Sequence, residues 1–167
     1  LARSMKIVQV AKTGLFASQV EALGPLGPGI AGAAYWTPTF PYSSPLAKIT
    51  SKDLAEGYQN STGRQWSQQL GPSLALFDVA AAAFQAAADP KDKAGVAAAL
   101  AGLDVQTTVG RLRWGQGPNK NVVATPIFGG QWVSTPAGSR YPLDFVLCDN
   151  TLDPDVPVAA TLKPYGA

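Results

Sequence analysis

The chain has 167 residues, which is enough for one domain with a substantial hydrophobic core. Apolar residues make up 46% of it and charged residues 14%, with a formal net charge of +2, so a globular protein with a weakly charged surface is expected. The basic residues are few and scattered, which argues against nucleic acid as a partner, and no apolar run approaches the roughly 20 residues that a membrane-spanning helix needs.

Histidine is absent and Cys148 is the single cysteine. Without histidine the chain lacks the commonest general base, the usual serine and cysteine catalytic relays and most zinc ligands. We therefore expect no enzyme, no metal and no cofactor; detectable turnover of a candidate ligand would favour the remaining interpretation, an α/β enzyme. The first residues (LARS) resemble neither a signal peptide nor a usual translation start, which leads us to expect a fragment or a processed chain.

The N-terminal third alternates predicted strands and helices. Residues 6–11 (KIVQVA) have the β-branched content of a short buried strand, and a short helical segment over residues 15–23 follows. Glycines and prolines over residues 24–29 cannot continue a helix and predict a loop. Residues 30–36 (IAGAAYW) predict a second strand.

Three helices are predicted in the middle of the chain. The first begins after a cap at Ser51 and ends at Gly63, and the last is a short amphipathic helix over residues 91–100. Between them, residues 71–88 (GPSLALFDVAAAAFQAAA) are apolar on nearly every side, so we expect this helix to be buried almost completely. Its water-facing stripe is predicted to be narrow, consisting of Asp78, Ala82, Gln85 and Asp89.

The C-terminal part predicts a ribbon of strands followed by a proline-rich tail. Residues 107–114 alternate well enough for one strand, with Arg111 and Arg113 on its solvated face. Residues 122–133 predict a long strand, and residues 144–148 a short one within a wrapping tail. The long strand is interrupted by a break or a bulge, at Pro126 or at Gly129-Gly130.

Three segments in this order resemble the C-terminal half of ABC-transporter substrate-binding proteins of the branched-chain amino acid type, the type I periplasmic binding proteins. The first is residues 6–16, followed by AAYWTP at residues 33–38. The second is residues 58–88, with TGRQW ahead of the apolar helix, and the third is residues 108–132, with a T-x-x-G-x-x-x-[WF] strand, a polar turn and a closing GQW. The resemblance covers about residues 5–133.

The resemblance implies an α/β fold, namely part of a two-lobe structure with a parallel sheet, covering helices and three crossings between the lobes, here without its N-terminal half. Residues 1–50 would belong to the C-terminal lobe and residues 51–106 would be helices of the N-terminal lobe. Residues 107–133 would be strands that cross the hinge, and residues 134–167 a C-terminal tail.

The function that the resemblance implies is that of an extracytoplasmic, periplasmic component of an ABC importer. Such a protein closes its lobes around a small-molecule ligand, here an amino acid or an aromatic or aliphatic carboxylate, and delivers it to an inner-membrane ABC permease. The alternative is a ligand-sensing domain of the same fold that regulates a receptor or a transcription complex. If the chain is a fragment, strand exchange with a second copy is expected to complete the sheet in a homodimer.

The first candidate ligand contacts follow the first predicted strand, because ligands of open α/β sheets sit outside the carboxyl ends of the strands. Lys12 would pair with a carboxylate and Thr13 would donate a hydrogen bond. The alternative for these two residues is a solvated lysine and a helix cap. Phe16 would either wall the pocket or pack in the core.

Two further candidate positions are the end of the second strand and the start of the apolar helix. Tyr35 and Trp36 suit stacking on a ligand, but neighbours alternate across a strand, so at most one of them faces the cleft, with packing as the alternative. Gly71 and Ser73 lie where free N–H groups favour an anion, or where the serine is a hydrogen-bonding cap without a ligand. Trp66, Trp114 and Trp132 are interpreted as packing residues.

Overall fold

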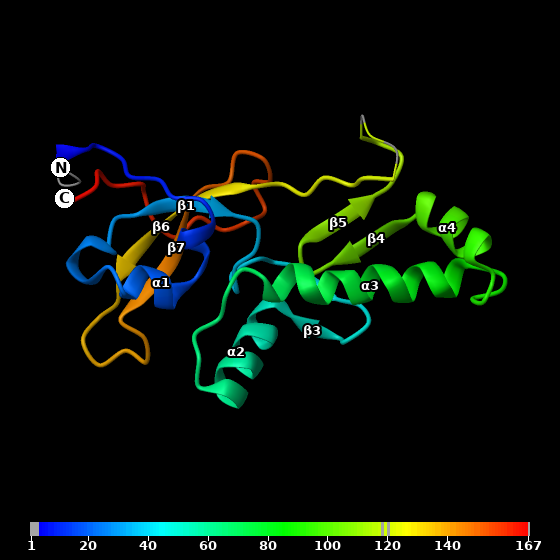
Figure 1. Ribbon diagram of the computed structural model, residues 1–167, viewed down its shortest axis with the longest axis horizontal. Coiled ribbons are helices and arrows are strands. Elements are labelled where there is room, and N and C mark those ends of the chain that lie inside the picture. The colour runs from blue at the N-terminus through cyan, green and yellow to red at the C-terminus, as the bar shows by residue number, and fades with distance from the viewer. Residues whose placement is uncertain (1–3, 118, 120, 167) are drawn as a thin grey trace.

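The computed structural model describes residues 4–117, 119 and 121–166, apart from the side chain of Thr13. The fold is mixed α/β and elongated, with a three-stranded sheet and α1 at one end (Figure 1). The long helix α3, helix α4 and a β-hairpin form the other end, and α2 lies between the two. No helix in the described ranges is long and apolar enough to span a bilayer.

The main sheet contains β1 (Ala31–Ala34), β6 (Phe128–Ser134) and β7 (Leu143–Asp149) in the order β1-β6-β7. These strands confirm the predicted ones at residues 30–36, 122–133 and 144–148, with somewhat different bounds. The predicted bulge is also confirmed, since the β6–β7 register shifts between Gly129 and Gly130. A Cβ on Gly130 would lie 2.4 Å from the Phe145 ring, so only glycine allows the two strands to approach this closely.

The expected parallel sheet is wrong, because β1–β6 and β6–β7 are both antiparallel and the described residues form one parallel bridge. The predicted strand at residues 6–11 is extended, but it contributes only a parallel bridge between Gln9 and Ala31 among the described residues. Ile7 is 57% exposed, so the apolar content that predicted a buried strand lies at the edge of the sheet. Immediately afterwards the chain turns into a 3₁₀ helix, η2 (Lys12–Leu15), which ends the pairing.

The predicted helix at residues 15–23 is confirmed in a shorter form. Helix α1 (Ala17–Glu21) follows η2 and buries Val20 in the core, and a short 3₁₀ helix, η3 (Gly24–Leu26), occupies the predicted loop. Trp132 on β6 donates its indole N–H to the Gly14 carbonyl at 2.8 Å. This bond ties the first helical segments to the centre of the sheet.

Helix α2 (Ser51–Thr62) follows a short hairpin whose strands, β2 (Ser43–Ser44) and β3 (Ile49–Thr50), have two residues each. Its cap is Thr50 rather than the predicted Ser51: the Thr50 hydroxyl accepts from the Asp53 N–H, and the Asp53 carboxylate accepts from the Thr50 N–H. The Thr50 hydroxyl, 2.7 Å from the Asp53 carboxylate, and the Thr50 N–H both donate to that carboxylate and hold the pKa of Asp53 below its usual range. Ser51 is buried instead and donates its hydroxyl to the Tyr42 carbonyl at 3.1 Å.

Helix α3 (Leu70–Ala86) confirms the predicted helix at residues 71–88, but the prediction of which side is buried was wrong. Leu76, Phe77 and Phe84 are 71%, 65% and 51% exposed and lie on one stripe. Asp78, which was placed on the water-facing stripe, is only 2% exposed. Its carboxylate accepts from the Ser44 hydroxyl at 2.5 Å and from a backbone N–H at 3.2 Å, so bonds to the β2–β3 segment decide which face packs.

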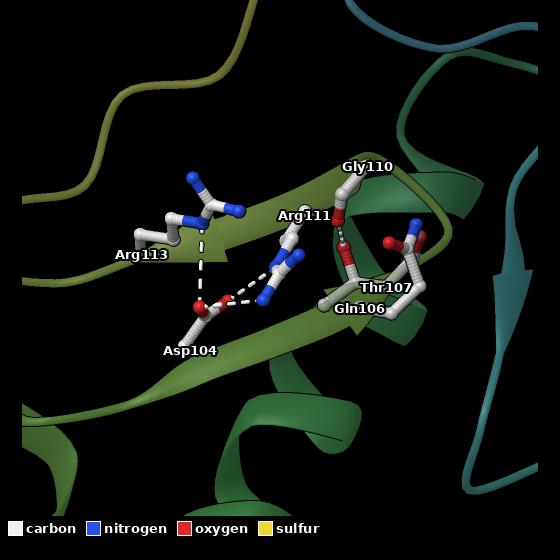
Figure 2. Close-up of polar contacts among 6 residues, drawn as sticks. All are labelled: Asp104, Gln106, Thr107, Gly110, Arg111 and Arg113. Atoms are coloured by element: carbon white, nitrogen blue, oxygen red, sulfur yellow. Dashed lines mark hydrogen bonds and ion pairs between the residues drawn. The ribbon is translucent and has the colours of Figure 1, made fainter.

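Helix α4 (Lys93–Ala101) confirms the predicted helix at residues 91–100, whereas the strand predicted at residues 107–114 is a turn and half of a hairpin. Strands β4 (Asp104–Thr107) and β5 (Gly110–Arg113) pair antiparallel, and Gly110 adopts a φ of 100° at the turn. Figure 2 shows Arg111 and Arg113 of β5 bound to Asp104 of β4 at 2.6 Å and 3.3 Å. The two arginines are half-exposed but ion-paired rather than simply solvated, and Arg111 holds the pKa of Asp104 below its usual range.

The tail after β7 wraps around the sheet. Val156 is fully buried, and the Tyr165 N–H donates to the Lys6 carbonyl at 2.8 Å. The Gln131 side chain donates to the Lys163 carbonyl at 2.9 Å and accepts from its N–H at 3.1 Å. The tail thus brings the two ends of the described chain together beside the main sheet.

Candidate functional site

Two open cavities lie between the sheet end of the molecule and α2 with the linker that follows it. The first, of about 590 Å³, is called the Arg64 cavity, and the second, of about 350 Å³, is called the Asp144 cavity. Both volumes are within the usual range for small-molecule sites. The Trp66 side chain lines both cavities.

The Arg64 cavity has aromatic walls and two opposite charges. Its lining includes Phe16, Glu21, Tyr58, Arg64, Trp66 and Tyr141. Within the described part of the chain, the side chains of Arg64 and Glu21 make no hydrogen bond or ion pair with protein groups. Both charges are therefore available to a ligand, and the rings supply apolar contact area.

The linker that carries Arg64 is held by specific bonds. Gly63 ends α2 in the left-handed conformation (φ 73°), which turns the chain toward the sheet. The Gln65 amide then donates to the Leu143 carbonyl at 2.7 Å, and the Tyr141 hydroxyl contacts the Gly63 carbonyl at 3.4 Å. The wall of the cavity is thus fastened to β7 and to the β6–β7 loop.

A second tie across the same boundary comes from Arg140. Its guanidinium donates to the Asn60 side chain at 2.9 Å and to the Gln59 carbonyl at 2.5 Å, and it lies 5.3 Å from the centre of the Tyr141 ring. The acceptors are at the C-terminal end of α2, where the helix dipole favours a cation. The β6–β7 loop therefore connects the sheet end of the molecule to α2 beside the Arg64 cavity.

The Asp144 cavity differs in its charge. Asp144 lines it from β7, and burial raises the pKa of this carboxyl. Lys52 and Glu56 line it from α2 and form an ion pair at 3.8 Å with both side chains more than half exposed. The hydroxyls of Thr37 and Thr39 also line the cavity and hydrogen-bond to each other at 2.8 Å.

Two of the sequence-predicted site residues, Trp36 and Gly71, are brought into contact, but as packing partners. Trp36 is fully buried and donates its indole N–H to the Ser51 hydroxyl at 3.2 Å. A Cβ on Gly71 would lie 2.1 Å from the Trp36 ring, so the indole occupies the space that a larger residue would fill. Trp36 also packs edge-on against Trp66 with ring centres 5.9 Å apart, and so supports the residue that lines both cavities.

The other predicted residues do not join this group. Tyr35 is half-buried, accepts from the Gln69 amide at 3.1 Å and lines neither cavity; burial raises the pKa of its hydroxyl. Lys12 and Ser73 are exposed and also lie outside both cavities. Thr13 belongs to η2, and its side chain lies outside the described residues.

Sequence reasoning missed Arg64, Glu21 and Tyr141, and it interpreted Trp66 as a packing residue only. Phe16, for which both interpretations were open, is 37% exposed and lines the Arg64 cavity. One signal was available, because the TGRQW segment contains Gly63 and Arg64 directly after a helix end. The contribution of Tyr141 depends on the long-range position of the β6–β7 loop and has no local signal.

Among solved structures, the chain is similar to the leucine-binding protein LivK of Thermotoga maritima, with a TM-score of 0.60 and 15% sequence identity. The similarity covers 89% of this chain and 38% of that protein. This chain has part of the type I periplasmic-binding-protein fold. It spans well under half the length of the protein that it matches. Neither a family model nor a curated protein sequence matches the chain.

Proposed function

We propose that the chain binds a small organic solute in the Arg64 cavity, as part of the extracytoplasmic solute-binding component of an ABC importer. The observation that carries the proposal is an open, aromatic-lined cavity with one cation and one anion, Arg64 and Glu21, neither of which is ion-paired with another described residue. A fold shared in part with a leucine-binding protein supports it.

The lining favours an amino acid or an aromatic or aliphatic carboxylate as the ligand. Arg64 would bind the carboxylate, because a guanidinium presents paired donors that match two carboxylate oxygens. Glu21 would bind the ammonium group of an amino acid, and Phe16, Tyr58 and Trp66 would contact an apolar side chain. Aromatic carboxylates without an amine would use Arg64 and the rings alone.

In this proposal the walls belong to two different lobes. Phe16 and Glu21 come from the C-terminal lobe (residues 1–50). Tyr58 and Arg64 come from the N-terminal lobe (residues 51–106), Tyr58 from α2 and Arg64 from the linker after it. A ligand that contacts both walls would shift the population toward a closed arrangement. The closed protein would then deliver the solute to an inner-membrane permease from the periplasm.

Calorimetric titration with L-leucine, L-phenylalanine and phenylacetate tests the proposal. We expect saturable binding of at least one of them, and an Arg64→Gln variant should lose about 10- to 100-fold in affinity, because hydrogen bonds to charged groups contribute about 1.5–3 kcal/mol. Glu21→Gln should weaken the two amino acids but not phenylacetate. Arg113→Gln, an arginine outside both cavities, is the matched control and should leave binding unchanged. Unaltered binding by Arg64→Gln, or no binding of any of the three, would refute the proposal.

A further inference from the structure

The Asp144 cavity carries a carboxylate that has no cationic partner among the residues that the structure describes. Asp144 is half-buried in β7, and its Oδ1 accepts from the Phe145 N–H at 3.0 Å. Within the described ranges no other hydrogen bond and no ion pair reaches this carboxylate. A partly desolvated anion with a single neutral donor is costly, and a bound cation would offset that cost.

The other charges around the cavity cancel. Lys52 and Glu56 are one turn apart on α2, with Nζ and Oε1 3.8 Å apart, and their side chains are 72% and 55% exposed. This pair therefore lies toward solvent and neutralises itself. The remaining lining residues are uncharged, so the net charge of the lining is that of Asp144.

The neutral groups of the cavity also suit a cation. The hydroxyl oxygens of Thr37 and Thr39 are 2.8 Å apart, and one hydroxyl donates a hydrogen bond to the other. Both oxygens keep lone pairs that can accept from an ammonium group. Trp66 and Phe145 add aromatic side chains to the lining, and ring faces attract cations. A carboxylate, hydroxyl acceptors and aromatic rings together form the environment that recognises an organic amine.

We propose that the Asp144 cavity is a second binding site, which takes the protonated amine of a small organic molecule with Asp144 as its counter-ion. The hydroxyls of Thr37 and Thr39 accept from the ammonium group, and Trp66 contacts the apolar body. A volume of about 350 Å³ limits the ligand to a small one. The site is separate from the Arg64 cavity in charge and in the residues that select the ligand, so it does not depend on the function proposed for that cavity.

Benzylamine is a suitable probe, because it combines a primary ammonium group with one aromatic ring, and benzyl alcohol is its uncharged counterpart. We expect saturable binding of benzylamine by calorimetry, at least tenfold tighter than that of benzyl alcohol. In the ¹H–¹⁵N spectrum of the unmodified protein, benzylamine should shift the Trp66 indole and the amides of Thr39 and Asp144. This measurement needs no variant and therefore stands even if a substitution impairs folding.

Asp144→Asn should weaken benzylamine binding at least tenfold, because it keeps the side-chain shape and removes the charge. Asp155→Asn is the matched control, since Asp155 is an exposed carboxylate in the tail that lines neither cavity. Glu21→Gln, which removes the carboxylate proposed to bind amines in the Arg64 cavity, should leave benzylamine binding unchanged, which separates this site from the Arg64 cavity. The proposal is overturned if benzylamine and benzyl alcohol bind equally, if neither binds, if Asp144→Asn binds as well as the unmodified protein, or if the shifts map to other residues.

Discussion

Replacing Gly71 by alanine should destabilise the protein, although the substitution favours a helix in general. The new Cβ would lie 2.1 Å and 2.2 Å from Cδ1 and Cγ of Trp36, whereas carbon atoms in contact are about 3.5–4.0 Å apart. The indole would have to move by about 1.5 Å in a fully buried environment, which strains its 3.2 Å hydrogen bond to Ser51.

The magnitude follows from three contributions. Overpacking of a buried core costs about 1–3 kcal/mol, and this contact with a rigid ring belongs near the upper end. Loss of the indole hydrogen bond adds about 1 kcal/mol, and the helix preference of alanine returns about 0.5–1 kcal/mol. We therefore expect Gly71→Ala to lower the free energy of unfolding by about 3 kcal/mol, which corresponds to a fall in Tm of roughly 6–12 °C for a chain of this size.

Gly57→Ala is the matched control for this prediction. Gly57 lies inside α2, and a Cβ there would have no atom within 4 Å, so the substitution should stabilise the protein by about 0.5–1 kcal/mol. Urea denaturation followed by circular dichroism measures both variants, with an unchanged m-value as the sign that only stability changed. If Gly71→Ala were as stable as the unmodified protein, the packing of Trp36 against α3 would be wrong.

Three further substitutions test the packing of α3 and the electrostatics of β7. Asp78→Ala should cost about 1–3 kcal/mol in the urea assay, since it leaves the buried Ser44 hydroxyl without its acceptor; an unchanged stability would contradict the assigned orientation of α3. Phe84→Gln should change stability by less than about 0.5 kcal/mol, and a large loss would indicate that this face is covered in solution. Asp144→Asn should stabilise the protein at pH 7 but not at pH 3: burial raises the folded-state pKa of this carboxyl, so folding stability falls as pH rises from the unfolded-state pKa through the folded-state value. Equal effects at both pH values would show that Asp144 is not desolvated.

The features that the sequence predicted correctly are those set by local chemistry. The end of α2 at Gly63 requires a left-handed residue, and the bulge at Gly129-Gly130 requires the absence of a side chain next to Phe145. In both places glycine itself is the local signal, although the contact with Phe145 that requires Gly130 lies on another strand. The helix at residues 71–88 was also predicted, because no glycine or proline interrupts the apolar run after Pro72.

The features that the sequence did not predict depend on contacts between distant residues. The buried face of α3 is decided by the Ser44–Asp78 bond, whose partners are 34 positions apart, and an almost uniformly apolar helix contains no internal signal for that choice. The same holds for strand direction, since a short apolar strand reads alike in parallel and antiparallel pairs. The Arg64 cavity combines Phe16 with Tyr141, and no local pattern relates two such positions.

Trp36 shows how a predicted ligand contact can serve a site indirectly. Its position at the end of a strand suggested stacking on a ligand, but the absence of a side chain at Gly71 leaves room for the indole inside the core. There it meets Trp66 edge-on at 5.9 Å, and Trp66 lines both the Arg64 and the Asp144 cavities. The absence of a side chain at Gly71 therefore helps to position Trp66, and Trp66 forms one wall of both cavities.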